Sequence, residues 1–106
     1  MVSSVVNDKV LGMDNQEAGE LLERELSPFR CQSYSALVDR TSNEPVRLHR
    51  SGSTGQNYQL EIKFVWDERA GGDVRVLGSI DDGGWRTFLP HTRSFIKSPD
   101  DSVVRE

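Results

Sequence analysis

Several aspartates and two histidines lie near the ends of predicted strands, where loops commonly carry catalytic and metal-binding residues. They are Asp67, Asp73, Asp81, Asp82, His49 and His91. Carboxylates and imidazoles could act there as general acid and base, or bind a metal ion together. One cluster is not expected, because Asp67 and Asp73 flank one predicted turn while Asp81 lies about eight residues, or ~26 Å, further along a strand. We therefore expect turn-forming aspartates that bond neighbouring amides, and no metal site.

The other reactive groups lack the partners that catalysis needs. His49 and His91 are too far apart in sequence for a zinc pair on one helix. Cys31 is the only cysteine, and it lies between two predicted helices without a base that the sequence places beside it. The Gly71-Gly72 and Gly83-Gly84 pairs lack the following helix that a phosphate-binding loop requires. These residues predict neither a catalytic centre nor a cofactor site.

Length and composition predict one soluble domain. The chain has 106 residues, of which 35% are hydrophobic and 28% are charged, which suits a single core with a large solvated surface. Its formal net charge of −4 argues against a nucleic-acid partner. No run approaches the ~18 apolar residues that span a membrane, and a lone cysteine suits a reducing cytoplasm. We expect residues 1–12 to form a flexible arm and residues 13–106 to form the domain.

Two helices are predicted ahead of the strands. Asp14 and Glu17 have the spacing of a capping box, and an apolar stripe follows, so a helix should span about residues 15–26. Ser27-Pro28 should end it, because proline disfavours helical geometry in the residue before it. A second, short helix should begin at Ser33 and fray by residue 42.

Alternation of apolar and polar side chains predicts strands through the second half of the chain. Residues 57–67 alternate with the period of a half-buried strand, and residues 46–49 and 74–81 continue the pattern on either side. Asp82-Gly83 suits a tight hairpin turn, which would pair Ile80 with Trp85 in a fourth strand ending at Pro90. The tail beyond should turn at residues 98–101.

These elements predict an α+β fold, with one or two N-terminal helices packed on a four-stranded, mostly antiparallel meander sheet. The expected core consists of Leu21, Leu22, Leu26, Leu37, Leu60, Ile62, Phe64, Val74, Val76, Ile80 and Trp85. Gly78 interrupts the third strand, which indicates that a bulky neighbour, either Trp85 or a helix side chain, needs the space.

The order of residues around the Asp-Gly turn is distinctive. It comprises Tyr58, Trp66-Asp67, Arg75-Val76, Gly78-Ser79-Ile80-Asp81-Asp82-Gly83-Gly84-Trp85-Arg86, Pro90, Phe95-Ile96 and Ser98-Pro99-Asp100. In these residues the last half of the chain resembles a group of small uncharacterised bacterial proteins. The resemblance implies a bacterial, cytoplasmic protein and carries over no catalytic residue.

The second face of the sheet, opposite the helices, has the mixed composition of protein interfaces. Its candidate contact residues are Val65, Arg75, Leu77, Arg86 and Phe88, which lie among Glu61 and Lys63. The function expected from this face is a small non-enzymatic interaction or regulatory module that binds another protein or itself. Alternatively, the C-terminal tail covers the face through Phe95 and Ile96.

A rival function is a small hydrolase or ligand-binding enzyme with its site beside the Asp-Gly turn. That site would use Asp81, Asp82, Arg86 and His91. A pocket with convergent polar groups would favour the enzyme, whereas a flat amphipathic face would favour the interaction module.

Overall fold

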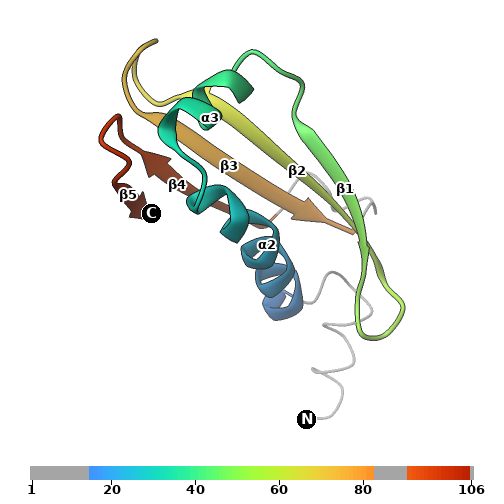
Figure 1. Cartoon of the computed structure of the whole chain (residues 1–106). Coiled ribbons are helices and arrows are strands. Elements are labelled where there is room, and N and C mark those ends of the chain that lie inside the picture. Colours follow the sequence, from blue (N-terminus) through green and yellow to red (C-terminus); the bar gives the residue numbers. More distant parts are fainter. Residues whose placement is uncertain (1–14, 83–90, 106) are drawn as a thin grey trace.

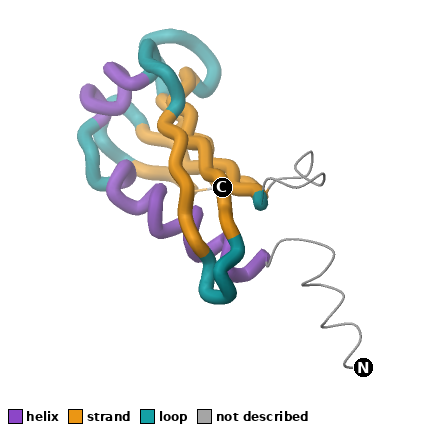
Figure 2. Tube along the Cα trace, turned by 90° about the vertical axis from the view of Figure 1, so that its right-hand side faces the viewer, coloured by secondary structure: helices purple, strands orange, loops and turns teal. Residues whose placement is uncertain are grey.

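The computed structural model describes residues 15–82 and 91–105. Within these ranges the elements are α2 (Asn15–Arg30), α3 (Tyr34–Arg40), β1 (Val46–Ser51), β2 (Asn57–Trp66), β3 (Val74–Asp81), β4 (His91–Lys97) and β5 (Val103–Arg105). Both helices lie on the same side of one sheet (Figures 1 and 2). This is the predicted α+β class, with five strands among the described residues where the sequence predicts four. The expected N-terminal arm lies outside the described residues.

The sheet is an antiparallel meander in the order β1-β2-β3-β4-β5. The predicted alternation holds in the first three strands, where β2 and β3 bury every second side chain against the helices. Leu48 pairs with Leu60, and Phe64 pairs with Val76, so apolar positions of neighbouring strands share one face. That register follows from the period of two, because a slip of one residue would turn every buried side chain outward.

The predicted fourth strand is wrong. β3 pairs with β4, which begins at His91, so that Ile80 lies beside His91 and Val76 lies beside Phe95. The sequence instead favoured a tight turn that pairs Ile80 with Trp85. Phe95 is fully buried in this register, and the burial of a large aromatic side chain outweighs a local turn preference. Trp85 itself, which was expected in the core, lies outside the described residues.

The predicted end of the first helix is also wrong, because α2 continues through Pro28 to Arg30. Proline lacks the N–H that would bond the carbonyl one turn earlier, so this turn is weakened locally. It is held by the sheet instead: Phe29 packs edge-on against Phe64 with ring centroids 5.1 Å apart, and the Arg30 guanidinium lies 5.2 Å from the centre of the Phe95 ring. Tertiary packing overrides the local preference.

Lys97 fastens the C-terminal end of α2 to the sheet. Its side chain lies on the helix face of β4 and is 5% exposed, and Nζ donates to the carbonyl of Arg30 at 2.8 Å. The last carbonyls of a helix have no partner within it and carry the negative end of its dipole. The Lys97 ammonium therefore donates to one of these carbonyls and places a positive charge at the negative end of the dipole.

The core lies between the helices and the sheet. Its buried members are Ala18, Leu21, Leu22, Leu26, Leu37, Tyr58, Leu60, Ile62, Phe64, Val74, Val76, Ile80 and Phe95. Gly78 lets α2 approach closely, since a Cβ at this position would lie 2.8 Å from Leu22 Cδ1 and 3.2 Å from Leu26 Cδ2. Helix side chains therefore use the space that the glycine leaves, which is one of the two alternatives that the sequence indicated.

The first turn of α2 is tied to the β1–β2 hairpin. Glu17, predicted to take part in a capping box, accepts hydrogen bonds from the Tyr58 hydroxyl at 2.9 Å and from the Ser53 N–H at 2.7 Å. Its predicted partner Asp14 lies outside the described residues. The carboxylate therefore joins the helix to the sheet as well as lying near the positive end of the helix dipole.

α3 begins where it was predicted. The Ser33 hydroxyl accepts from the Ala36 N–H at 3.2 Å, which is a typical N-cap. Tyr34 then joins two loops at one end of the sheet: its N–H donates to Asp101 Oδ1 at 2.7 Å, and its hydroxyl donates to the Gly72 carbonyl at 2.6 Å. The β2–β3 and β4–β5 connections are held together through this short helix.

The predicted turn at residues 98–101 is confirmed. The Ser98 N–H bonds the Ser102 carbonyl at 2.9 Å, and Asp101 takes a positive φ of 70°. Hydrogen bonds from Ser102, first from its side chain and then from its backbone N–H, lower the pKa of Asp100 below its usual value. This aspartate shapes a turn, as the sequence predicts for the aspartates of such loops.

Candidate functional site

The sheet face that points away from α2 and α3, called here the outer face, carries four apolar side chains on four neighbouring strands. They are Val65, Leu77, Ile96 and Val104, called here the outer patch. Val65 is 41% exposed and Val104 is 53% exposed, while Leu77 and Ile96 are half-buried. The helix face is buried at the neighbouring positions of β2 and β3, although Val103 of β5 is 38% exposed there. Exposed apolar side chains that adjoin one another, unlike scattered ones, indicate a contact surface.

Three of these residues share one cross-strand row with an arginine. Val65 pairs with Arg75, Arg75 pairs with Ile96, and Ile96 pairs with Val104. Directly paired residues of adjacent strands lie about 5 Å apart, so the row runs without a break from β2 to β5. Leu77 lies two residues along β3 from Arg75, on the same face. The outer patch therefore surrounds the Arg75 side chain.

Arg75 is held by groups of its own chain. Nε and Nη2 donate to Asp67 Oδ1 at 2.9 and 2.6 Å, and Nη1 donates to the Ser94 hydroxyl at 3.2 Å. The two charged side chains are 26% and 15% exposed. Each guanidinium nitrogen thus has a partner, and the charge at the centre of the outer patch is neutralised within the chain.

The far half of the outer face is polar. Glu61 pairs with Arg47 at 3.1 Å and lies 3.7 Å from Lys63, and Ser79 and Thr92 continue its row. Such exposed pairs add little to stability, typically ~0–1 kcal/mol. Their effect here is on charge: within the described residues, the outer face holds the cations Arg47, Lys63 and Arg75 and the anions Glu61, Asp67, Asp73 and Asp81.

The structure brings together three of the five predicted contact residues. Val65, Arg75 and Leu77 adjoin one another on the outer face, while Arg86 and Phe88 lie outside the described residues. The alternative in which Phe95 covers this face is wrong, because Phe95 is fully buried on the helix face. Ile96 does reach the outer face, as part of a strand within the sheet.

Sequence reasoning did not place Asp67, Ser94 or Val104 on this surface, and it placed Ile96 there only as part of a covering tail. The signal for β4 was weak, since residues 91–94 are all polar and burial alternates clearly only over residues 94–97. It was masked by the Asp-Gly turn, which placed the fourth strand too early. Val104 lies in a strand of three residues, too short to show a period.

Two residues of the rival enzyme site, Asp81 and His91, belong to opposite faces of the sheet, and Asp82 follows the last residue of β3. Asp81 ends β3 on the outer face, whereas His91 pairs with Ile80 on the helix face, and His91 Nε2 would lie 3.3 Å from a Cβ at Gly19 in α2. Arg86 lies outside the described residues. Within residues 15–82 and 91–105, no group of three or more histidine, cysteine, aspartate or glutamate side chains could hold a metal ion.

An open groove of about 840 Å³ runs along α2 on its β4 side, from Gln16 to Cys31. Three of its charged side chains contact one another: Glu23 lies 2.5 Å from Arg30 and 3.8 Å from Arg93. Cys31, which is exposed, lies at the groove's end. The groove does not gather polar groups on one point, as a catalytic pocket does.

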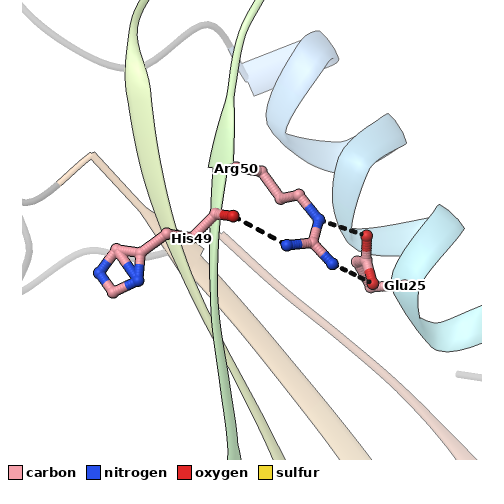
Figure 3. A network of polar contacts seen from close by, with 3 residues as sticks. All are labelled: Glu25, His49 and Arg50. Atoms are coloured by element: carbon pink, nitrogen blue, oxygen red, sulfur yellow. Dashed lines mark hydrogen bonds and ion pairs between the residues drawn. The ribbon is translucent and has the colours of Figure 1, made fainter.

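The outer edge of β1 is covered by an arginine. The Gly52 N–H bonds the Gln56 carbonyl at 2.7 Å, and by antiparallel alternation the backbone of Arg50 then points to β2 while that of His49 points away from the sheet. Arg50 Nη1 donates to this His49 carbonyl at 2.8 Å, and Arg50 Nε donates to Glu25 of α2 at 2.8 Å (Figure 3). Charged groups on edge strands oppose pairing with other chains.

Comparison with protein-family models, with curated proteins and with solved structures found no match. Within the described ranges, neither helix has the length and the apolar character needed to cross a bilayer.

Proposed function

We propose that this protein is a small non-enzymatic interaction module of a bacterial cytoplasm and that its outer face is the binding surface. The observation that supports this most directly is the outer patch: Val65 and Val104 are exposed and Leu77 and Ile96 are half-buried, whereas β2 and β3 bury nearly every side chain on the other face. Leaving such a patch in water costs roughly 25 cal/mol per Å² of apolar area, which a partner would recover.

The charges of the outer face fit a binding surface better than a catalytic one. Arg75 is bonded to Asp67 and Ser94, so it orders the face and is not presented to a substrate. Aromatic and aliphatic centres ringed by paired polar groups are typical of protein interfaces. The rival hydrolase stays a hypothesis, with Asp81 and His91 on opposite faces as the observation against it.

The exposed Cys31 fits the proposed compartment. A single exposed thiol is compatible with a reducing cytoplasm, where it does not oxidise to an intermolecular disulfide. The bacterial assignment rests on the sequence resemblance described above.

Two lysine substitutions on the same face test the proposal. Leu77→Lys places a charge in the outer patch, and Thr92→Lys places the same charge in the polar half as a matched control. Both variants should fold with wild-type circular dichroism. Each is immobilised beside wild type, exposed to a bacterial lysate, and any protein lost only with Leu77→Lys is purified and its affinity measured directly.

We expect at least a tenfold loss of affinity for Leu77→Lys and little change for Thr92→Lys, since central apolar contacts dominate binding energy. Equal affinity of both variants and wild type would remove the outer face as the binding surface. Should Leu77→Lys unfold, Val65→Lys replaces it in the same comparison, because the Val65 side chain is 41% exposed.

A further inference from the structure

The structure assigns a specific occupant to the outer face: we infer that it binds a second copy of this chain, face to face, about a two-fold axis parallel to the strands. This inference rests on the proposed function, in that the outer face must be a binding surface. It adds the identity of the partner and the residues that meet across the interface.

The hydrogen bonds of Arg75 within its own chain limit the kinds of partner that suit the outer face. All three guanidinium nitrogens bond Asp67 or Ser94, so burying the pair leaves no unmatched charge for an acidic partner to neutralise. Buried charges are tolerated when they are paired and hydrogen-bonded, as these are. The surface that fits such a centre is flat and apolar, and the outer face of another copy has that character.

Net charge favours the same face. Three cations and four anions leave the outer face of the described residues with a formal charge of −1, so most of the chain's formal charge of −4 is carried elsewhere. Two copies therefore repel each other over most of their surfaces and less here. Like-charge repulsion of this kind disfavours wrong orientations in a complex.

The sheet edges are poorer routes to association. The β1 edge is covered by Arg50 and Glu25, and β5 has only three residues, so edge pairing would add few backbone bonds. The outer face is larger: β2, β3, β4 and β5, the strands that overlap in the pairing described next, have 10, 8, 7 and 3 residues and present roughly 440 Å² in projection, at ~3.3 Å per residue and ~4.8 Å between strands. Standard interfaces bury about 800 Å² per partner, so a dimer with Kd in the micromolar range is expected.

The order of residues in the cross-strand row selects the symmetry axis. An axis along the row would place Arg75 over its own copy, where like charges meet. An axis parallel to the strands, passing between β3 and β4, instead reverses the row: Val65 then faces Val104 of the other copy, and Arg75 faces Ile96 of the other copy. In this arrangement each apolar side chain of the row lies against a side chain of the other copy. The interface is isologous, so each contact occurs twice.

Cysteine cross-linking tests this pairing directly. Facing sheets pack ~10 Å apart, which is beyond the reach of a disulfide, so a short bis-maleimide is the suitable reagent. In a Cys31→Ser background it should join the double variant Val65→Cys/Val104→Cys into a covalent dimer, while each single cysteine variant should stay monomeric on a denaturing gel. Within one chain the two positions are three strand spacings, or ~14 Å, apart, which is too far for this reagent to join them. Cross-linking by either single variant, or none by the double variant, would overturn the pairing.

Sedimentation of the full chain gives an independent measure. Wild type should shift from 11.9 kDa toward twice that mass with a midpoint on the order of 10 µM, and Leu77→Lys should weaken self-association at least tenfold while Thr92→Lys does not. A wild-type chain that stays monomeric at about a hundred times that concentration would overturn the dimer.

The two proposals fail differently. If wild type is monomeric but Leu77→Lys alone loses a purified partner, the second copy is excluded and the interaction module stands. If neither self-association nor partner affinity responds to Leu77→Lys, both are excluded. Should Leu77→Lys fail to fold, Val65→Lys, at a side chain that is 41% exposed, takes its place in both measurements, and sedimentation of wild type still decides the dimer.

Discussion

The two faces of the sheet have the same alternation but differ in what their side chains meet. On the helix face, Leu22 and Leu26 of α2 fit against Gly78, and the strand side chains beneath them are almost completely buried. On the outer face, Val65 and Val104 stay open although they adjoin other apolar groups. Burial on one face stabilises the fold, whereas apolar exposure on the other is compatible with folding and is available for association.

The largest loss of stability is expected when a buried leucine that packs on the helix face is truncated. Leu22→Ala removes a fully buried side chain above Gly78 and should lower the free energy of unfolding by about 3–5 kcal/mol. Val65→Ala on the outer face is the matched control and should cost less than about 1 kcal/mol in the dilute chain. Urea denaturation measures both. Similar losses would mean that the two faces are buried alike.

Removal of the Asp67 charge should show whether the outer face is organised by its ion pair. Asp67→Asn weakens two hydrogen bonds to a partly buried guanidinium, for an expected loss of about 1–2 kcal/mol. Glu61→Gln, in the exposed pair with Arg47, should change stability by less than about 0.5 kcal/mol. If denaturant titration gives equal losses of stability for the two variants, the pair of Arg75 and Asp67 does not order the outer face.

A change at the sheet edge separates association by faces from association by edges. Arg50→Ala uncovers the His49 carbonyl and breaks the bond to Glu25, for a loss of about 1 kcal/mol or less. We expect faster aggregation, followed by light scattering, because an open edge pairs with other chains. Arg47→Ala, whose partner Glu61 lies on the outer face, is the control. If both variants aggregate at the wild-type rate, Arg50 does not protect the edge.

The smallest effect is expected at Asp100, which belongs to neither face. Its folded pKa is lowered, so the contribution of its ionised form is present above the ordinary pKa of 3.8 and is lost as pH falls through the folded value. NMR titration should place its midpoint below 3.8, and Ser102→Ala should return the midpoint toward 3.8. An unchanged midpoint in that variant would contradict the assigned cause.

The helix face could be predicted from the sequence because its signals are regular. The period of two in β2 and β3 identified the buried positions, and the apolar stripe of α2 identified its partner. Predictions failed where a local preference opposed a distant contact. Pro28 should have ended α2, yet Phe29 and Arg30 pack on Phe64 and Phe95, and these contacts are invisible to a local rule.

Half of the outer face was predictable for the same reason. Val65, Arg75 and Leu77 lie in strands whose register the alternation determined. Ile96 and Val104 depend on where β4 begins, and the Asp-Gly turn suggested an earlier strand. The bond between Arg75 and Asp67 could not be foreseen, because residues of either charge can pair in several ways across an open face.

Because Lys97 bonds the end of α2, the rate at which its amine reacts measures local opening between α2 and the sheet. The Lys97 side chain is enclosed and its amine donates to Arg30, whereas the Lys63 side chain is 51% exposed. An acylating reagent should therefore modify Lys63 at once and Lys97 only when the last turn of α2 lifts from β4. The ratio of the two rates reports how often the helix and the sheet separate at this point, without denaturant and without a substitution.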